Sequence, residues 1–558
     1  MRPNNLFFIL ILTVEFLFAQ DINNTKVKVI EGFNPSIPEA NRLNENAILI
    51  DTIKENRMQE YNIIDVDIKS DFKINPLRPA TVKASKISQL FNTRMSLGTG
   101  FGVTSRSSLL YNSKRSKRSS YSILLNQYSN NIKIDAKEAG SSIYDINISG
   151  KIIKDKNIYT GHLEYENKGF FTYGKGTDDN SKMNNPFYNR FSFSEILFSV
   201  LSKERDENKL RHHTVFFASD LNQGVENEFF VNSNLEKNVY GLDFSLGLEL
   251  NRYLNYNSID TAYKGLGVSL IRFAPSLDIN TYGFDFQLGL EVKLEQDTNV
   301  SFGFAPHFQI SKEIVEDILL IQTGLRHIEY RNTLRSIFNE NPYIHSYGMN
   351  QSVLGYADDR VKQEVRMAEN DEFYFSIYNI LGKGQFFNVD FSYGFLTDFP
   401  YFVAVQTDDY IRFKINYMDL QQLTIKSNYN LTFSKILSLD AIFKFYHWNE
   451  EVYHHPNIES HLSLPINLRE KIYITPSFAY IGQRLSRKEF HYSPADSPLP
   501  EVMSLSSVFH ANLELHYNYS KQLSFYFDLN NLTNSKNEFW IDYKNFGFNG
   551  VFGVSYSF

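Results

Sequence analysis

The sequence predicts an all-β protein, a large antiparallel transmembrane β-barrel, on three observations. The stretch 281–294 (TYGFDFQLGLEVKL) alternates apolar and polar residues, which indicates a long strand with one apolar and one polar face. Similar alternation recurs from about residue 93 to the end of the chain. The chain also ends in an aromatic residue, Phe558, which follows further alternating apolar positions.

The length of the stretch 281–294 indicates a membrane rather than a soluble core. At about 3.3 Å per residue it is roughly 43 Å long, and a tilt of about 40° leaves it roughly 33 Å tall. The apolar band of an outer membrane is ~25 Å thick. Ordinary strands average about 5–6 residues, so a strand of this length is more than a soluble fold needs.

The first residues, Met1–Ala19, have the features of a secretory signal peptide. Arg2 supplies a positive start, Leu6–Phe18 forms an apolar core, and Ala19 is a small residue at a plausible cleavage point before Gln20. The apolar core is short for a spanning helix. The chain has 0 Cys, so disulfides cannot stabilise it and we expect the closed strand ladder to do so.

Residues 20–92 differ in composition from the rest of the chain. They combine prolines with charged residues and contain one short candidate strand, Val27–Ile30. We expect an extended segment that lies in the periplasm or inserts into the barrel lumen. The stretch VKVIEG at 27–32 could contact a TonB protein, although a simple tether is the more ordinary interpretation.

The barrel is predicted over 93–558, with about 20 strands and an even number of them. Two polar stretches interrupt the rhythm, at 331–371 and at about 487–502, and are expected to be long loops. The last strand is predicted over 546–558. Its outward positions would be Phe546, Phe548, Phe552, Val554, Tyr556 and Phe558. The pattern of Phe552, Val554, Tyr556 and Phe558 resembles the C-terminal signal that the outer-membrane barrel-assembly machinery recognises, so that machinery is an expected partner.

A soluble β-sandwich would also show alternating strands. Three features favour the barrel: the predicted export signal, an uninterrupted strand region of about 465 residues that exceeds a usual soluble core, and tight turns that alternate with much longer loops. The mean hydropathy of −0.34 does not conflict with a barrel, because half of each spanning strand faces water. We therefore expect the bacterial cell outer membrane as the location.

Several stretches resemble a known family. The stretch NLTNSKNEFW at 531–540 and the ending GFNGVFGVSYSF at 547–558 are similar to the C-terminus of TonB-dependent receptor-like outer-membrane β-barrels of Bacteroidota. The stretches NPY at 341–343, NLREK at 467–471 and NSKRSKRSSY at 112–121 resemble a subgroup that lacks a recognisable plug. The resemblance implies solute transport, with a TonB-like protein as partner, while the missing plug argues against TonB-driven uptake.

No enzyme motif stands out, and the chain is predicted not to be an enzyme. The adjacent histidine pairs, His212–His213 and His454–His455, place neighbours on opposite faces of a strand, so neither pair forms a two-ligand metal site alone. The adjacent aspartates at 178–179, 358–359 and 408–409 lack the spaced oxygen ligands of a Ca²⁺ loop. We expect no metal, no cofactor and, at a net charge of −7, no nucleic acid.

One cluster of cations is a candidate lipid contact. Lys114, Arg115, Lys117 and Arg118 form the first predicted turn. If that hairpin faces outward, these side chains would meet the phosphates of lipopolysaccharide, since both residue types bind phosphate. The alternative is an ordinary solvated turn, which is the commoner case.

The lumen is expected to be polar and to carry both signs of charge. The predicted lumen-facing residues are Asp243, Glu249, Asp285, Gln287, Glu291, Lys293, Lys426, Asn428, Glu514, His516 and Asp528. The segment 20–92 and the loop 331–371 are the available fillers. Two functions remain open: a transport barrel that passes or imports a small solute, and a non-conducting barrel that serves as a scaffold for other envelope proteins.

Overall fold

The computed structural model describes residues 90–103, 105–135, 137–174, 187–222, 226–255, 267–296, 300–330, 332–344, 366–382, 384–406, 411–490 and 501–558. The predicted signal peptide with Ala19 and Gln20, and nearly all of the segment 20–92, lie outside these residues. Within the described residues, no helix is both long and apolar enough to span a membrane.

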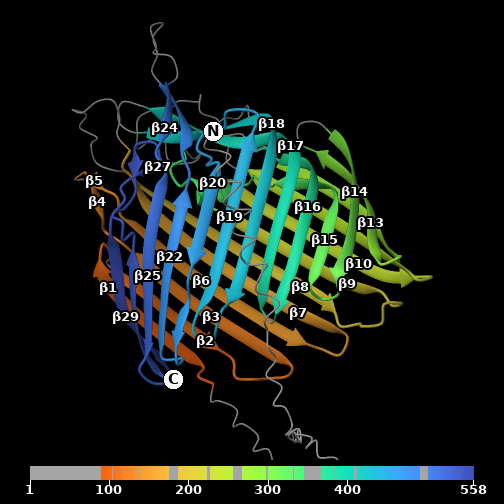
Figure 1. Cartoon of the computed structure of the whole chain (residues 1–558), viewed down its shortest axis with the longest axis horizontal. Helices are drawn as coiled ribbons and strands as arrows, with labels where there is room; N and C mark the ends of the chain where they lie inside the picture. Colours follow the sequence, from red (N-terminus) through yellow and green to blue (C-terminus); the bar gives the residue numbers. More distant parts are fainter. Residues whose placement is uncertain are drawn as a thin grey trace, which may run out of the picture. The chain divides into compact units, whose positions relative to one another are not determined.

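The described residues form a closed antiparallel barrel of 22 strands (Figure 1). The wall consists, in order, of β1 (Thr93–Phe101), β2 (Ser105–Asn112), β3 (Ser119–Ser129), β6 (Ser141–Ile153), β7 (Asn157–Thr172), β8 (Phe187–Ser202), β9 (Arg211–Leu221), β10 (Glu226–Val239), β11 (Leu242–Asn255), β12 (Gly267–Thr281), β13 (Phe284–Gln296), β14 (Val300–Val315), β15 (Leu319–Tyr330), β16 (Ala368–Gly382), β17 (Gln385–Gln406), β18 (Ile411–Thr432), β19 (Ser438–Trp448), β20 (Ile458–Ser463) with β21 (Ile466–Leu468), β22 (Ile472–Ile481), β25 (Val508–Asn518), β26 (Leu523–Asn530) and β29 (Asn549–Ser557). This confirms the predicted large barrel.

The first and last strands close the barrel. β1 pairs antiparallel with β29 from Arg94↔Ser557 to Phe101↔Gly550, and the two lie side by side in Figure 1. The backbone N–H groups of Asn92 and Thr93 both donate to the carbonyl of Phe558 at 3.1 Å. Closure satisfies backbone groups that a lipid environment would leave unpaired.

The two ends of the barrel differ. Short turns and the C-terminus lie at one end, at the bottom of Figure 1, and longer connections lie at the other. In outer-membrane barrels short turns face the periplasm and long loops face outward. We call these the turn end and the loop end.

The predicted strand 281–294 is wrong at its start. Thr281 ends β12, and Tyr282 and Gly283 adopt left-handed backbone angles (φ 52° and 73°) that make a tight turn. Tyr240 and Gly241 repeat this arrangement between β10 and β11. The turn shifts the alternation by one position, from Leu277 and Ile279 in β12 to Phe284 and Phe286 in β13. Tyr282 falls on the apolar positions of β13, so the periodicity extends the predicted strand into the turn. The 22 strands compare with a predicted number of about 20.

The last predicted strand is also shorter than expected. β29 begins at Asn549, and the half-buried Phe546 packs inward against a core inside the barrel instead of facing lipid. Phe552, Val554, Tyr556 and Phe558 do lie exposed on one outward face. Alternation alone does not reveal that a loop has turned into the lumen.

Short elements cluster in the loop-end connections. They are β4 (Lys133–Ile134), β5 (Lys137–Glu138), α2 (Leu334–Glu340), β23 (Arg484–Phe490), β24 (Glu501–Leu505), β27 (Glu538–Trp540) and β28 (Tyr543–Lys544). α2 lies within the predicted loop 331–371. Thr333 caps its N-terminus in a reciprocal capping box with Ser336.

Candidate functional site in the barrel lumen

A hydrophobic core lies inside the loop end of the barrel. It joins residues of α2, such as Ile337 and Phe338, to Tyr543 of β28 and to Phe413 of β18. Because α2 and β28 come from connections far apart in the chain, the core ties two loops to the barrel wall. The loop end is therefore filled by packed side chains where these loops meet.

Aromatic contacts fix the two loops to each other. The rings of Tyr343 and Tyr543 stack with centroids 3.7 Å apart. The Tyr543 hydroxyl donates to the carbonyl of Ile411 at 2.6 Å, and the Tyr173 hydroxyl donates to the carbonyl of Lys544 at 2.8 Å. Burial raises the pKa of Tyr343 to about 12, so its hydroxyl stays protonated and neutral at physiological pH.

Charged contacts hold α2 against the wall. The first two residues of the helix each contact a carboxylate of the wall. The Leu334 N–H donates a hydrogen bond to Glu226 at 2.6 Å, and the Arg335 guanidinium forms an ion pair with Glu195 at 2.8 Å. A carboxylate at a helix N-terminus satisfies free N–H groups and opposes the helix dipole. Glu226 and Glu195 belong to β10 and β8, so the wall itself positions the helix.

A network of ion pairs lines the inner wall of β11 to β16. Arg272 pairs with Glu249 at 3.2 Å, with Glu291 at 2.8 Å and also with Glu329. Lys293 pairs with Glu329 at 2.8 Å and also with Glu369. The network confirms an inward position for the predicted lumen residues Glu249, Glu291 and Lys293, and it stiffens this side of the wall.

A pocket of about 300 Å³ lies on the inner side of β15 to β20. Its lining includes Arg326, Glu372, Lys426, Trp448 and Glu459. Arg326 pairs with Glu372, while Lys426 has no ion pair among the described residues. The indole N–H of Trp448 has no hydrogen-bond partner there either. Aromatic and charged groups thus converge on one cavity, where the charged groups could orient a small molecule.

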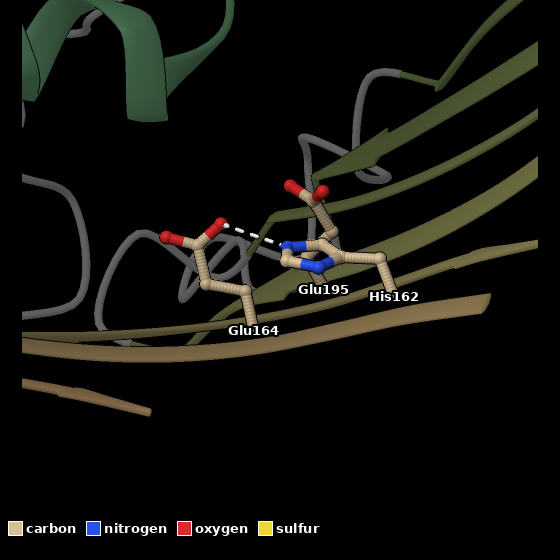
Figure 2. Close-up of side chains that lie close together, drawn as sticks. All are labelled: His162, Glu164 and Glu195. Carbon is tan, nitrogen blue, oxygen red and sulfur yellow. Dashed lines mark ion pairs between the residues drawn. The ribbon is translucent and has the colours of Figure 1, made fainter. Parts of the chain in front are cut away.

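Two clusters have donor atoms close enough to hold a metal ion. Figure 2 shows His162, Glu164 and Glu195 converging from neighbouring strands, with a 3.8 Å ion pair between His162 and Glu164. Arg335 already compensates part of the charge of this cluster, because its guanidinium contacts Glu195 at 2.8 Å and Glu164 at 3.8 Å. A metal would have to compete with that cation.

The second cluster is likewise paired with an arginine. It consists of Glu291, His327 and Glu329, and both carboxylates pair with Arg272. The geometry of both clusters is that of structural ion pairs between strands rather than of an open metal site.

The structure places the basic turn at the turn end. Lys114, Arg115, Lys117 and Arg118 lie between β2 and β3, at the same end as Phe558 (Figure 1). An outward-facing hairpin was the condition for contact with lipopolysaccharide, and it conflicts with the usual orientation of turn ends. The contact stays a prediction that needs the opposite orientation.

The predicted histidine pairs do not combine into sites. Neighbouring His212 and His213 lie on β9 and point to opposite faces. His454 and His455 lie in the β19–β20 loop, where each contacts a backbone carbonyl, of Phe402 at 3.0 Å and of Pro400 at 3.2 Å. The aspartate pairs at 178–179, 358–359 and 408–409 lie outside the described residues.

Sequence reasoning missed the partners that complete the site. Arg272, Arg326, Glu329 and Glu369 carry the network and part of the pocket, yet none was singled out. Arg272 lies within an interrupted alternation around Pro275, and Glu369 lies in a stretch assigned to a loop. The inward position of Arg272 follows from the register of β12. Glu329 and Glu369 are inside the barrel because the ends of β15 and β16 turn inward, which the alternation of the sequence does not show.

Comparison with solved structures identifies the fold. The chain is similar to a variant of the ferric enterobactin receptor PfeA from Pseudomonas aeruginosa (TM-score 0.56, 12% identity, 84% of this chain and 80% of that one). It is similar to the ferric-catecholate import receptor Fiu from K12 E. coli (0.57, 11%, 84% and 82%) and to the siderophore receptor PirA from Acinetobacter baumannii (0.59, 12%, 85% and 81%).

The fold is that of TonB-dependent siderophore receptors. Neither a protein-family model nor a curated protein matches the chain. Exposed apolar side chains cover the outer surface of the closed barrel, which suits a bilayer. The receptor-like barrel is therefore a protein of the bacterial outer membrane.

Proposed function

We propose that this barrel transports a small solute across the outer membrane, in the manner of a TonB-dependent receptor. The observation that supports the proposal is the 300 Å³ pocket, which opens on the inner wall of a receptor-like barrel. The proposal includes export by a signal peptide at Met1–Ala19, membership of a plug-less Bacteroidota subgroup, and a TonB-like protein as partner.

The charge of the pocket favours a solute of low net charge. Three carboxylates, Glu340, Glu372 and Glu459, face two cations, Arg326 and Lys426, so the lining sums to −1 with histidine neutral. The similar solved structures include receptors for ferric siderophores. A strongly anionic cargo would meet an unfavourable field here, whereas a neutral or zwitterionic solute would not.

Uptake into proteoliposomes tests this proposal. A neutral disaccharide and a zwitterionic dipeptide should enter faster than citrate. Lys426→Gln should slow the entry of citrate further, because it removes the unpaired cation. Lys435→Gln, in a turn-end loop, is the matched control and should change nothing. Faster entry of citrate than of the other two solutes would contradict the proposed solute class.

A second function, a non-conducting scaffold barrel, is favoured by the aromatic core that fills the loop end. Single-channel conductance with and without residues 20–92 separates the two functions. A barrel that stays silent after this deletion supports the scaffold, whereas a conducting one supports transport. Co-purification with a TonB-like protein would support energy-coupled uptake.

A further inference from the structure

One seam of the wall is only partly paired. β14 pairs with β13 from Val300 to Ser311, but its pairing with β15 begins only at Phe308↔Leu325 and continues toward the turn end. On the β15 side, the backbone of 300–307 makes no strand pairing within the described residues. The loop-end half of β14 is therefore an open sheet edge.

The missing partner is held elsewhere by charge. Residues 326–330 of β15 pair with β16 alone. Glu329 has a side chain only 4% exposed, and its ion pairs with Lys293 and Arg272 hold it against the inner faces of β13 and β12. The ends of β15 and β16 thus turn into the barrel, away from the edge of β14.

The sequence itself prevents β15 from closing the gap. If the register Phe308↔Leu325 continued, Glu329 would lie opposite Phe304 and would face lipid, where a charged side chain is costly. Pro306 lies just beyond the last paired residue, and proline cannot donate a ladder hydrogen bond. Both features indicate that the sequence itself specifies the unpaired edge.

The outward-facing apolar side chains at this edge are more exposed than those of the neighbouring strand. Val300, Phe302 and Phe304 are 66%, 70% and 63% exposed, compared with 44% for Leu288 and 41% for Leu294 on the next strand. Leu325 is the seventh residue of β15, which puts the end of pairing about 15 Å above the turn end. That height is within the ~25 Å apolar band, so the part of the edge next to His307 has no water on its lipid side to bind.

We propose that the edge formed by Val300–His307 docks an extended segment of another envelope protein, which adds a strand to the barrel wall. A strand is the partner that satisfies a row of backbone donors and acceptors in lipid. The segment should place apolar side chains beside Phe302 and Phe304. It should place small or polar ones beside Gly303 and Ala305, which face inward.

A second copy of this chain does not fit the edge. Two copies in one membrane are related by an axis along the membrane normal, so their β14 strands would run in the same direction. The rotation would also set the lipid-facing residues of one copy beside the inward-facing residues of the other. A different protein can supply the antiparallel strand that continues the outer surface.

Hydrogen exchange tests the proposal in three samples: native outer-membrane vesicles, detergent micelles and liposomes of the same lipids. The peptide 300–307 should exchange at least tenfold more slowly in native vesicles than in the two purified samples. The peptide 245–252 of β11, which pairs with β10 and β12 without interruption over this range, is the control and should exchange alike in all three. Equal exchange of 300–307 in vesicles and liposomes would overturn the proposal.

Photo-crosslinking in cells identifies the occupant. A benzoyl-phenylalanine at Phe304, or at Phe302 as a second site, should give a protein adduct. Mapping should place this adduct on an extended, alternating segment. The same probe at Phe273, which is 46% exposed on the doubly paired β12, should give lipid adducts only. Adducts with this chain itself, or no protein adduct at either edge site, would overturn the proposal.

Discussion

Arg106 on β2 and Asp528 on β26 form a 2.7 Å ion pair across the two strands that close the barrel. The Tyr526 ring lies beside this pair and covers Gly98 and Gly553, where any Cβ would collide with it. Side chains of the flanking strands β2 and β26 therefore contact each other across the inner side of the β1–β29 seam. These contacts add to the backbone hydrogen bonds between β1 and β29.

Removal of the Arg106 cation should destabilise the barrel at this seam. Arg106→Gln leaves the Asp528 carboxylate, with a side chain 11% exposed, with only His516 at 3.8 Å as a basic neighbour. This should cost about 1–3 kcal/mol. The double variant Arg106→Gln/Asp528→Asn should recover part of that loss. Urea unfolding in liposomes measures the free energy of unfolding of both variants.

Lys133→Gln, which removes the cation of an exposed ion pair with Glu138, is the control. Its free energy of unfolding should fall by less than about 0.5 kcal/mol. An additive double variant would contradict the prediction.

Gly303 should be intolerant of a side chain. A Cβ there would lie 2.5 Å from Lys293 carbons, and Lys293 is held by two ion pairs. We expect Gly303→Ala to destabilise the barrel by about 1–3 kcal/mol. Gly150 has nothing within 4 Å of its Cβ position, so Gly150→Ala serves as the matched control. Equal unfolding midpoints for the two variants would show that Lys293 moves aside freely.

The stacked tyrosines should control access to the lumen from the loop end. Tyr543→Ala removes the ring that stacks on Tyr343 and the hydroxyl bound to Ile411. Single-channel conductance should rise, while Tyr543→Phe, which keeps the ring, should change it little. The measurement should be made with and without residues 20–92. Unchanged conductance for Tyr543→Ala in both forms would show that the aromatic core does not limit passage.

His454 should make the barrel sensitive to acid. Its Nδ1–H donates to the Phe402 carbonyl, and its Nε2 is buried without a partner among the described residues. Burial lowers the pKa of His454 from 6.5 to about 3. Below pH 6.5 the unfolded chain binds a proton that the folded chain excludes, so stability should fall as pH drops toward about 3, by up to about 1.4 kcal/mol per pH unit.

Urea midpoints at pH 7.5, 5.5 and 4.5 check this dependence. His454→Asn keeps a donor for the Phe402 carbonyl and does not titrate in this range. Its midpoint should therefore fall less steeply with acid than that of the unchanged chain. Parallel pH profiles for the two proteins would assign the acid sensitivity to other groups.

The sequence by itself determined the class of fold and the two faces of its wall. Alternation with a period of two is a local property, so Leu288 and Phe552 could be placed outward, and Glu291 and Lys293 inward, without any contact being known. The same periodicity could not mark where β13 begins, because Tyr282 in the turn falls on the apolar positions of that strand.

Only the tertiary structure decided which charges meet and where the wall remains unpaired. Arg106 and Asp528 are 422 positions apart, and their contact depends on closure of the whole barrel. The inward course of β15, set by Glu329 and Lys293, depends on a register shared by several strands. Such pairings are properties of the closed ladder, and no local pattern in the chain encodes them.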